Sequence, residues 1–257
     1  MSESSDCRLS VVIPAFNEAS RLPQTLKQID FFFLEARELN PSEIIVVDDG
    51  SSDETYDVAG AFQPSSDIVV RRYFHQQNRG KGAAVRTGFR HSQGRQVLLS
   101  DADLAAPMSG LFRLLSVSSE TTIVIGSRAI DRSLLLKPQP FYRDLMGRTF
   151  NLLVRALLLP GILDTQCGFK LFPGQVARSL AMVQKIDGFA FDVELLTLAR
   201  FWNLIVVELG VPWGHVEASR VLPMKHSVEM FRDLLRITSR CWSRSLPSSP
   251  GVDLLDV

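Results

Sequence analysis

Short apolar runs alternate with helical stretches through the first half of the chain, and this alternation limits the possible folds more than any other feature. Runs of strand length, rich in Val, Ile and Leu, occupy residues 9–13, 43–47, 68–73, 96–100 and 122–125. Between the first two runs, apolar residues recur at helical spacing at Leu22, Leu26, Ile29 and Phe33. Strands that alternate with helices form a mostly parallel sheet covered by helices on both faces. The sequence therefore predicts an α/β fold.

The second half of the chain departs from this regular order. The elements expected there are a basic amphipathic helix over residues 143–159, a short strand near 168–172, helices near 175–182 and 191–202, a strand at 204–211 and a helix from Val228. The last residues, 245–257, are rich in Ser and Pro and are expected to be frayed. We therefore predict a single domain over residues 1–244 followed by a flexible tail over residues 245–257.

Charge, cysteine usage and hydropathy narrow the class of protein. Lys plus Arg and Asp plus Glu each number 28, so no net charge attracts nucleic acid, and an anionic ligand must be bound by a local cluster. Cys7, Cys167 and Cys241 lack disulfide or zinc-site spacing, which favours a reducing setting. No apolar run approaches the roughly 20 residues of a membrane-spanning helix. We expect a cytoplasmic protein that is soluble or peripheral on the membrane.

Two aspartates separated by one small residue follow the fourth predicted strand. Asp101 and Asp103 emerge together after the apolar run at 97–99, and Ala102 is too small to obstruct a ligand that they approach. Two acids this close repel each other unless a cation lies beside them. Mg²⁺ or Mn²⁺ would fit, because such ions take carboxylate ligands together with substrate phosphates. The alternative is a solvated turn in which the acids cap a helix.

Polar residues also follow the first and second strands. Pro14 ends the first strand and leads to Glu18, whereas Asp48 and Asp49 end the second. Ligands of open α/β sheets bind beyond the carboxyl ends of the strands, where acids can accept hydrogen bonds from a ribose or a base. The alternative is that Asp48 and Asp49 only cap the following helix.

Six motifs in a fixed order give the chain a specific resemblance. They are IPAFNE at 13–18, VDDGS at 47–51, NRGKGAAVR at 78–86, DAD at 101–103, DTQCGFKLF at 164–172 and FDVELL at 191–196. The first four resemble the family-two glycosyltransferases, which have the GT-A fold. The last two resemble the dolichyl-phosphate β-glucosyltransferases and the bacterial polyprenyl-phosphate glycosyltransferases. The resemblance extends from about Leu9 to about Leu235.

The resemblance implies a nucleotide pocket with a metal site. The nucleotide-binding residues would be Pro14, Ala15, Glu18, Asp48, Asp49, Lys81, Asp101 and Ala102. Asp101 and Asp103 would bind Mg²⁺ or Mn²⁺, with Asp101 also facing the donor. Some relatives have a polar ligand where this chain has Ala105, which leaves a third protein ligand unassigned. Lys81 lies in a loop without Walker spacing, and its flanking glycines, Gly80 and Gly82, are alternatively plain turn residues.

An acceptor site is implied as well. Its residues would be Arg128, Gln166, Lys170, Asp192, His215 and Lys225, with Asp164 near the reacting centre. Asp103, Asp164 and Arg128 would be the catalytic residues. A guanidinium suits a phosphate, although a surface arginine without function is the alternative for Arg128. Cys167 lies inside the motif at 164–172 and is interpreted as a packing residue.

The predicted reaction is transfer of a hexose to a dolichyl or polyprenyl phosphate in one displacement, with inversion at the sugar carbon. UDP-glucose is the first candidate donor and GDP-mannose the second. The basic helix at 143–155 either contacts the membrane or packs on the core. Two other functions stay open: a soluble family-two glycosyltransferase with a small or polysaccharide-precursor acceptor, and a sugar-phosphate nucleotidyltransferase. The oligomeric state is not readable.

Overall fold

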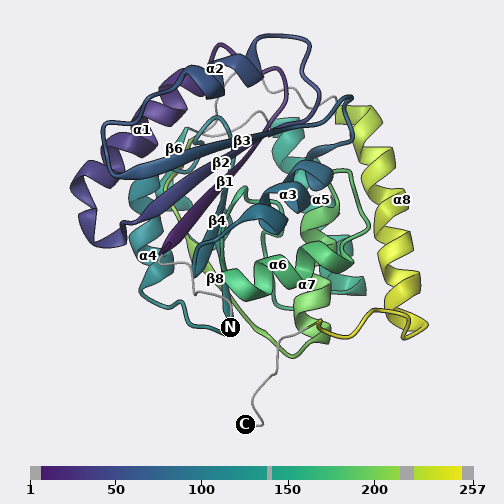
Figure 1. The fold of residues 1–257 in the computed structure, drawn as a ribbon. Coiled ribbons are helices and arrows are strands. Elements are labelled where there is room, and N and C mark those ends of the chain that lie inside the picture. The colour runs from purple at the N-terminus through teal and green to yellow at the C-terminus, as the bar shows by residue number, and fades with distance from the viewer. Residues whose placement is uncertain (1–6, 138–140, 215–222, 251–257) are drawn as a thin grey trace.

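A mostly parallel sheet forms the centre of the protein, as predicted (Figure 1). The computed structural model describes residues 7–137, 141–214 and 223–250, with only the backbone at 141–143 and 223–226. Seven strands lie in the order β3-β2-β1-β4-β7-β5-β8. They are β1 (Leu9–Ala15), β2 (Ser42–Asp48), β3 (Ile68–Phe74), β4 (Gln96–Ser100), β5 (Thr122–Ser127), β7 (Phe169–Pro173) and β8 (Ile205–Gly210).

One strand of the sheet runs against the others. β7 pairs antiparallel with both β4 and β5, whereas every other neighbouring pair is parallel. β7 therefore starts at the edge of the sheet where β4 and β5 end. A small second sheet pairs β6 (Leu135–Lys137) with β9 (Trp213–Gly214). Neither of these two short strands was predicted, because two or three residues carry no periodic pattern.

Helices cover both faces of the sheet (Figure 1). On one face lie α1 (Leu22–Glu35), α2 (Thr55–Ala61) and α4 (Leu111–Leu115). On the other face lie α3 (Lys81–His91), α5 (Phe141–Leu157), α6 (Gly174–Val183), α7 (Phe191–Phe201) and α8 (Pro223–Trp242). Short 3₁₀ turns occupy Arg37–Leu39, Met108–Gly110 and Arg132–Leu134.

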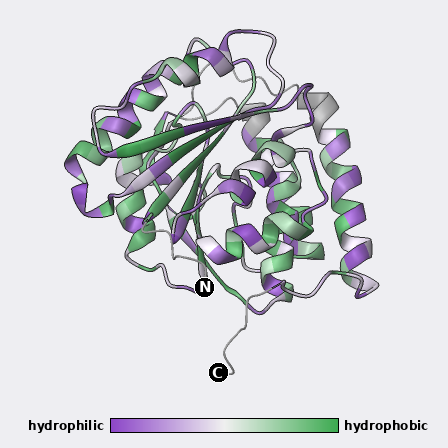
Figure 2. Ribbon diagram, in the orientation of Figure 1, coloured by the Kyte–Doolittle hydropathy of each residue, from purple (hydrophilic) through white to green (hydrophobic). Residues whose placement is uncertain are grey.

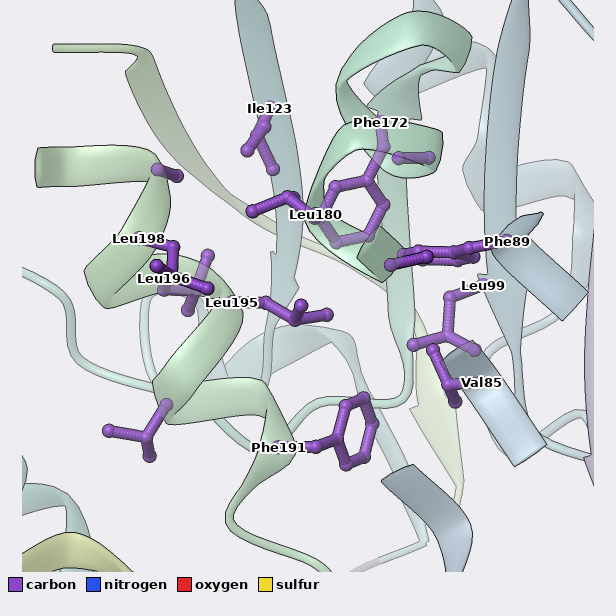
Figure 3. Packing of buried hydrophobic residues seen from close by; sticks show 14 of the residues in the cluster. Val85, Phe89, Leu99, Ile123, Phe172, Leu180, Phe191, Leu195, Leu196 and Leu198 are labelled. Atoms are coloured by element: carbon purple, nitrogen blue, oxygen red, sulfur yellow. The ribbon is translucent and has the colours of Figure 1, made fainter. Parts of the chain in front are cut away.

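The two faces of the sheet carry separate cores, because successive side chains of a strand point to opposite faces. Val11 and Ile13 of β1 face the α1 side, whereas Val12 faces the α3 side. The strands at the centre of the sheet are accordingly apolar through most of their length, whereas β3, at one edge, and the helices mix apolar and polar residues (Figure 2). On the α3 side, the rings of Phe89 and Phe172 meet edge to face with their centroids 5.0 Å apart (Figure 3).

The segment that follows α8 differs from its prediction. Leu246 is buried, the Trp202 indole donates a hydrogen bond to the Pro247 carbonyl at 2.9 Å, and the Ser179 hydroxyl donates to the Pro250 carbonyl at 2.9 Å. Residues 245–250 therefore pack against α6 and α7 instead of fraying. The domain boundary at residue 244 stays a prediction, and these contacts favour an end a few residues later. Residues 251–257 lie outside the described part of the chain.

Candidate active site

The carboxyl ends of β1, β2 and β4 meet at one edge of the sheet. Ala15 is in register with Asp48, and the Asp49 amide donates to the Ala15 carbonyl at 2.8 Å. Asp101 follows the last residue of β4, which is the other neighbour of β1. The predicted convergence of these three strand ends is confirmed.

Lys81, Asp101 and Asp103 form a charged group at the end of β4, which we call the β4 cluster. Lys81 Nζ lies 2.6 Å from Asp101 Oδ1, and the Ala105 amide donates to Asp103 Oδ1 at 3.1 Å. Burial and the charge of Asp101 raise the pKa of Asp103 above its ordinary value. Burial alone would lower the pKa of Lys81, but the charges of Asp101 and Asp192 outweigh it and raise that pKa. The cluster therefore holds one ammonium group against two carboxyl groups.

The loop of the β4 cluster is held from two sides. A β-carbon on Gly168 would overlap the Asp101 carboxylate, so the glycine leaves room for this side chain to reach Lys81. The Thr25 hydroxyl of α1 donates to the Ala102 carbonyl at 2.5 Å, and the Gly214 amide of β9 donates to the Ala105 carbonyl at 2.8 Å. These contacts fix the backbone on both sides of Asp103.

The β4 cluster fits a metal ion that takes part of its coordination from a ligand. In the part of the chain that the structure describes, no group of three or more His, Cys, Asp or Glu side chains could hold a metal ion. Ala105 has no side-chain ligand to offer. Burial and the Asp101 charge raise the pKa of Asp103 despite Lys81 and Arg21, and a bound cation would favour its charged form. Two carboxylates suit Mg²⁺ or Mn²⁺ when phosphate oxygens and water complete the shell.

Glu18 lies near this cluster through Arg21, a residue that the sequence analysis missed. Arg21 Nε and Nη2 donate to the two Glu18 carboxylate oxygens at 2.6 and 2.7 Å. The charge of Arg21 also lowers the pKa of Asp103, which places the guanidinium close to the β4 cluster. The sequence signal for Arg21 was its position three residues after Glu18, at the start of a helix.

The two aspartates at the end of β2 accept hydrogen bonds from backbone amides of the same chain. Asp48 Oδ1 accepts a hydrogen bond from the amide three residues later at 2.9 Å. Asp49 Oδ1 lies 2.7 Å from His75 Nδ1 and accepts from the Arg79 amide at 3.0 Å, while Oδ2 accepts from the Gly80 amide at 2.7 Å. Asp49 thus shapes the turn that precedes Lys81. The contact of this carboxylate with a ribose or base stays a prediction.

Arg128 and Asp164 form a second charged group at the end of β5, which we call the β5 cluster. Arg128 Nε and Nη2 donate to the two Asp164 oxygens at 2.7 and 2.8 Å, and the Arg128 amide adds a third bond at 3.0 Å. Burial alone would raise the pKa of Asp164, but the charge and hydrogen bonds of Arg128 hold it below its ordinary value of 3.8. The Asp164 carboxylate is therefore occupied, whereas the Arg128 side chain stays 23% exposed.

Lys170 and Asp192 form a buried ion pair, with Nζ 2.6 Å from Oδ1. Lys170 also donates to the Cys167 carbonyl, and the Cys167 side chain is buried, as predicted for a packing residue. Burial raises the pKa of Asp192, which the charges of Lys170 and Lys81 only partly offset. Their charged groups are buried and bind each other, and the contact of both residues with an acceptor stays a prediction.

Of the three remaining predicted acceptor residues, the structure describes only the side chain of Gln166. The Gln166 amide donates to Asp164 Oδ1 at 3.2 Å, and its side-chain Nε2 is buried without a hydrogen-bond partner among the described residues. An unsatisfied buried amide favours a ligand at this position. His215 lies outside the described residues, as does the side chain of Lys225.

Glu208 and Trp213 also shape the β5 cluster and were not predicted. Glu208 Oε1 and Oε2 accept hydrogen bonds from the amides of Asp164 and Leu163 at 2.8 and 2.7 Å. The Arg128 guanidinium carbon lies 5.4 Å from the centre of the Trp213 ring. The lone acid within the apolar strand β8 was a usable signal for Glu208. No pattern in the sequence identified Trp213.

Comparison with known proteins agrees with this geometry. The model of a family described as "Glycosyl transferase family 2" matches residues 10–179. The chain is 38% identical over 245 residues to the dolichyl-phosphate beta-glucosyltransferase of Dictyostelium discoideum, covering 90% of this chain and 74% of that protein. It is 36% identical over 244 residues to the human dolichyl-phosphate beta-glucosyltransferase, covering 91% of this chain and 75% of that protein.

Solved structures share the fold at lower identity. Glucosyl-3-phosphoglycerate synthase from Mycobacterium tuberculosis, in complex with Mn²⁺, UDP and glucosyl-3-phosphoglycerate, has a TM-score of 0.62 and 20% identity, covering 91% of this chain and 81% of that one. Mannosyl-3-phosphoglycerate synthase from Rubrobacter xylanophilus has a TM-score of 0.62 and 18% identity, covering 96% of this chain and 78% of that one. At this identity the likeness shows the fold alone.

Proposed function

The chain belongs to glycosyl transferase family 2, and we propose that it transfers glucose from UDP-glucose to a dolichyl or polyprenyl phosphate. The protein is a glycosyltransferase of the GT-A fold. The glucosyl donor and the lipid-phosphate acceptor come from the names of the relatives, which match most of both chains. The observation that carries the proposal is the β4 cluster, where two carboxyl groups and Lys81 meet at the edge of the sheet.

The β4 cluster would bind the donor's diphosphate together with Mg²⁺ or Mn²⁺. Asp101 and Asp103 would hold the ion, and Lys81 would contact phosphate oxygens. Such an ion supplies Lewis-acid stabilisation to a departing nucleoside diphosphate. Arg21, held by Glu18, adds a further positive charge near Asp103. Fixed cations at this point favour the charge that gathers on the leaving group.

The β5 cluster would bind the acceptor's phosphate. A phosphate monoester with a second pKa of about 6 is already anionic at neutral pH, so the acceptor oxygen needs no strong base. Arg128 is the partly exposed cation that would orient this oxygen, and Asp164 positions Arg128 through a two-point contact. A single displacement with inversion follows from this assignment, since no side chain is required as a nucleophile.

A thermal-shift panel of UDP, GDP and CDP, each with Mn²⁺, tests the donor assignment. A ligand that binds the native state raises its melting temperature, so UDP should give the largest shift. Product analysis with dolichyl phosphate against simple alcohols then tests the acceptor. Transfer to alcohols alone would support a soluble transferase, and release of pyrophosphate from a sugar phosphate and UTP would support a nucleotidyltransferase.

We also propose that α5 and α8 contact the membrane surface that presents the acceptor. In the described part of the chain, no helix has the length and apolar character needed to cross a bilayer. The α5 residues Leu145, Leu152 and Leu153 are nevertheless exposed beside Arg148 and Arg155. An exposed apolar stripe flanked by Arg232 and Arg236 runs along the neighbouring helix α8; it consists of Val228, Phe231, Leu235 and Trp242.

Exposed leucines beside arginines suit a surface of anionic lipid, because the acyl region accepts the leucines and the headgroups pair with the arginines. Flotation with vesicles of phosphatidylcholine and phosphatidylserine tests the contact. Leu152→Glu should reduce the floated fraction, whereas Phe31→Glu, at a similarly exposed position on α1, should not. Equal flotation of both variants and the wild type would remove this surface from the proposal.

The free thiols support a cytoplasmic setting for this reaction. Cys7, Cys167 and Cys241 are unpaired in the structure. Burial raises the pKa of Cys7 to about 11 and that of Cys167 to about 12, which keeps both thiols protonated and unreactive at neutral pH. We therefore place the protein at the cytoplasmic face of a membrane, where thiols stay reduced.

A further inference from the structure

The turn that carries Lys81 is pressed against a loop from a distant part of the chain. A β-carbon on Gly80 would overlap the Asp187 carbonyl, and one on Gly82 would lie 2.5 Å from the Ile186 carbonyl oxygen. The two glycines that flank Lys81 are thus required by close backbone packing. The Ala83 amide, in the first turn of α3, donates to the Asp187 carbonyl at 3.2 Å. The loop at 184–188 therefore sets where the Lys81 side chain begins.

This loop is itself held by a buried carboxylate on α7. Glu194 is fully buried, and its Oε2 accepts hydrogen bonds from the amides of Lys185 and Ile186 at 2.9 and 2.7 Å. The Gln184 side chain ties the loop to α3, since Nε2 donates to the carbonyls of Gly82 and Ile186 at 2.8 and 2.9 Å. Figure 3 shows Phe191, at the start of α7, beside Val85 of α3 in the same core.

The charge of Glu194 is balanced from α8. Arg240 Nη1 lies 2.6 Å from Glu194 Oε1, and the Arg240 side chain is only 19% exposed. A buried carboxylate without a partner is strongly unfavourable, so the loop geometry at Lys185 and Ile186 depends on this arginine. A continuous series of contacts therefore runs from α8 through Glu194 and the loop to Lys81.

We propose that Glu194 and Arg240 are positioning residues for Lys81. They hold the 184–188 loop against the first turn of α3 and so place the Lys81 ammonium group at Asp101, where the donor's diphosphate would bind. The donor contact rests on the proposed function, whereas the clamping of the turn rests on the geometry of the fold alone. Because Arg240 lies on α8, the seating of this helix would set the donor affinity from a position outside the β4 cluster.

Arg240→Gln tests the proposal in the full chain by titration of UDP in the presence of Mn²⁺. We expect UDP to bind about tenfold more weakly and the KM for UDP-glucose to rise, while the KM for the lipid phosphate stays unchanged. Arg240→Lys keeps the charge and should restore most of the affinity. Arg72→Gln is the control, because it breaks a surface ion pair with Asp57, away from both clusters, at an arginine side chain that is 39% exposed. It should leave UDP binding unchanged.

Hydrogen–deuterium exchange gives a second readout that needs no ligand. Exchange at the Lys185, Ile186 and Ala83 amides should accelerate in Arg240→Gln and not in Arg72→Gln. UDP affinity within twofold of wild type despite faster exchange at these amides would overturn the positioning role. Should Arg240→Gln not fold, Gln184→Ala replaces it and carries the same expectation. A wild type that binds no UDP would defeat the proposed function, and the exchange data would still decide whether Arg240 clamps the turn.

Discussion

The β4 and β5 clusters both place charged side chains at strand ends, but only the β5 cluster pairs each carboxylate with one cation. In the β5 cluster, one carboxylate meets one guanidinium in a two-point contact, and the pKa of Asp164 falls. In the β4 cluster, two carboxyl groups share Lys81, and the pKa of Asp103 rises. Aspartates at two similar strand ends therefore have different roles. The β4 cluster has one ammonium group for two carboxyl groups, and a bound ion would provide further positive charge. In the β5 cluster, the carboxylate instead holds an arginine in a fixed position.

Asp103→Asn should cause the largest loss of activity. Removing a metal ligand should lower kcat/KM by at least about a thousandfold, in line with the loss of a charge-stabilising group at a reaction centre. The free energy of unfolding should stay equal or rise slightly, because the raised pKa of Asp103 means that its charge is unfavourable in the folded protein. Activity assays and chemical denaturation of the same preparation measure both effects.

Asp57→Asn provides the control for this substitution. The Asp57 side chain, on α2, is 85% exposed and lies 3.9 Å from Arg72 of β3, so neither activity nor stability should change. An Asp103→Asn protein with wild-type turnover would contradict the metal role. A strongly destabilised one would show instead that Asp103 resembles Asp164.

Asp164→Asn should have its largest effect on stability. It leaves the Arg128 guanidinium beside a neutral amide, and we expect a loss of about 2–3 kcal/mol, below the full range for a buried pair because Arg128 is 23% exposed. Denaturant melts measure this loss. Asp144→Asn breaks a surface pair with Arg148 at 2.6 Å and should cost about 0.5 kcal/mol or less. Equal losses in the two variants would refute the contrast between the clusters.

The pH dependence of this loss follows from the lowered pKa of Asp164. A carboxyl group whose pKa is depressed by folding contributes stability above its ordinary value, here 3.8, and that stability disappears as the pH falls through the folded-state pKa. The difference in unfolding free energy between wild type and Asp164→Asn should therefore be constant near neutrality and shrink from about pH 5 downward. Asp30 and Asp131 titrate in both proteins, so the difference isolates Asp164. A difference that grows on acidification would contradict a lowered pKa of Asp164 in the folded protein.

The fold was predictable because its signals are local. The runs rich in Val, Ile and Leu that became β1, β2 and β4 are buried on both faces, which is the pattern of a parallel sheet. The strand ends then brought Ala15, Asp48 and Asp101 together without further information. Strands β6 and β9 were missed since they are too short to carry a pattern.

The use of each polar residue was less predictable than its location. Asp49 and Lys170 lie in the expected region, but each is buried against partners that follow it by about twenty residues or more in sequence. No local pattern reveals whether a carboxylate meets a ligand or an amide of its own chain. The same holds for Glu194, where the motif at 191–196 was recognised but Arg240 and the 184–188 loop were not.

Gly168→Ala sharpens the comparison with the smallest expected effect, because Gly168 precedes β7 and backs the β4 cluster. The added β-carbon would displace the Asp101 carboxylate, which is a flexible side-chain end, so the stability should change little. The Asp101 oxygens would leave their position at Lys81, and we expect Mn²⁺-dependent UDP binding to weaken about tenfold, or roughly 1.4 kcal/mol. Gly147→Ala is the matched control, since nothing lies within 4 Å of its added β-carbon in α5, and an alanine there favours the helix. Isothermal titration should find UDP affinity lost only in Gly168→Ala, and an unchanged affinity in both variants would show that the placement of Asp101 does not govern the donor site.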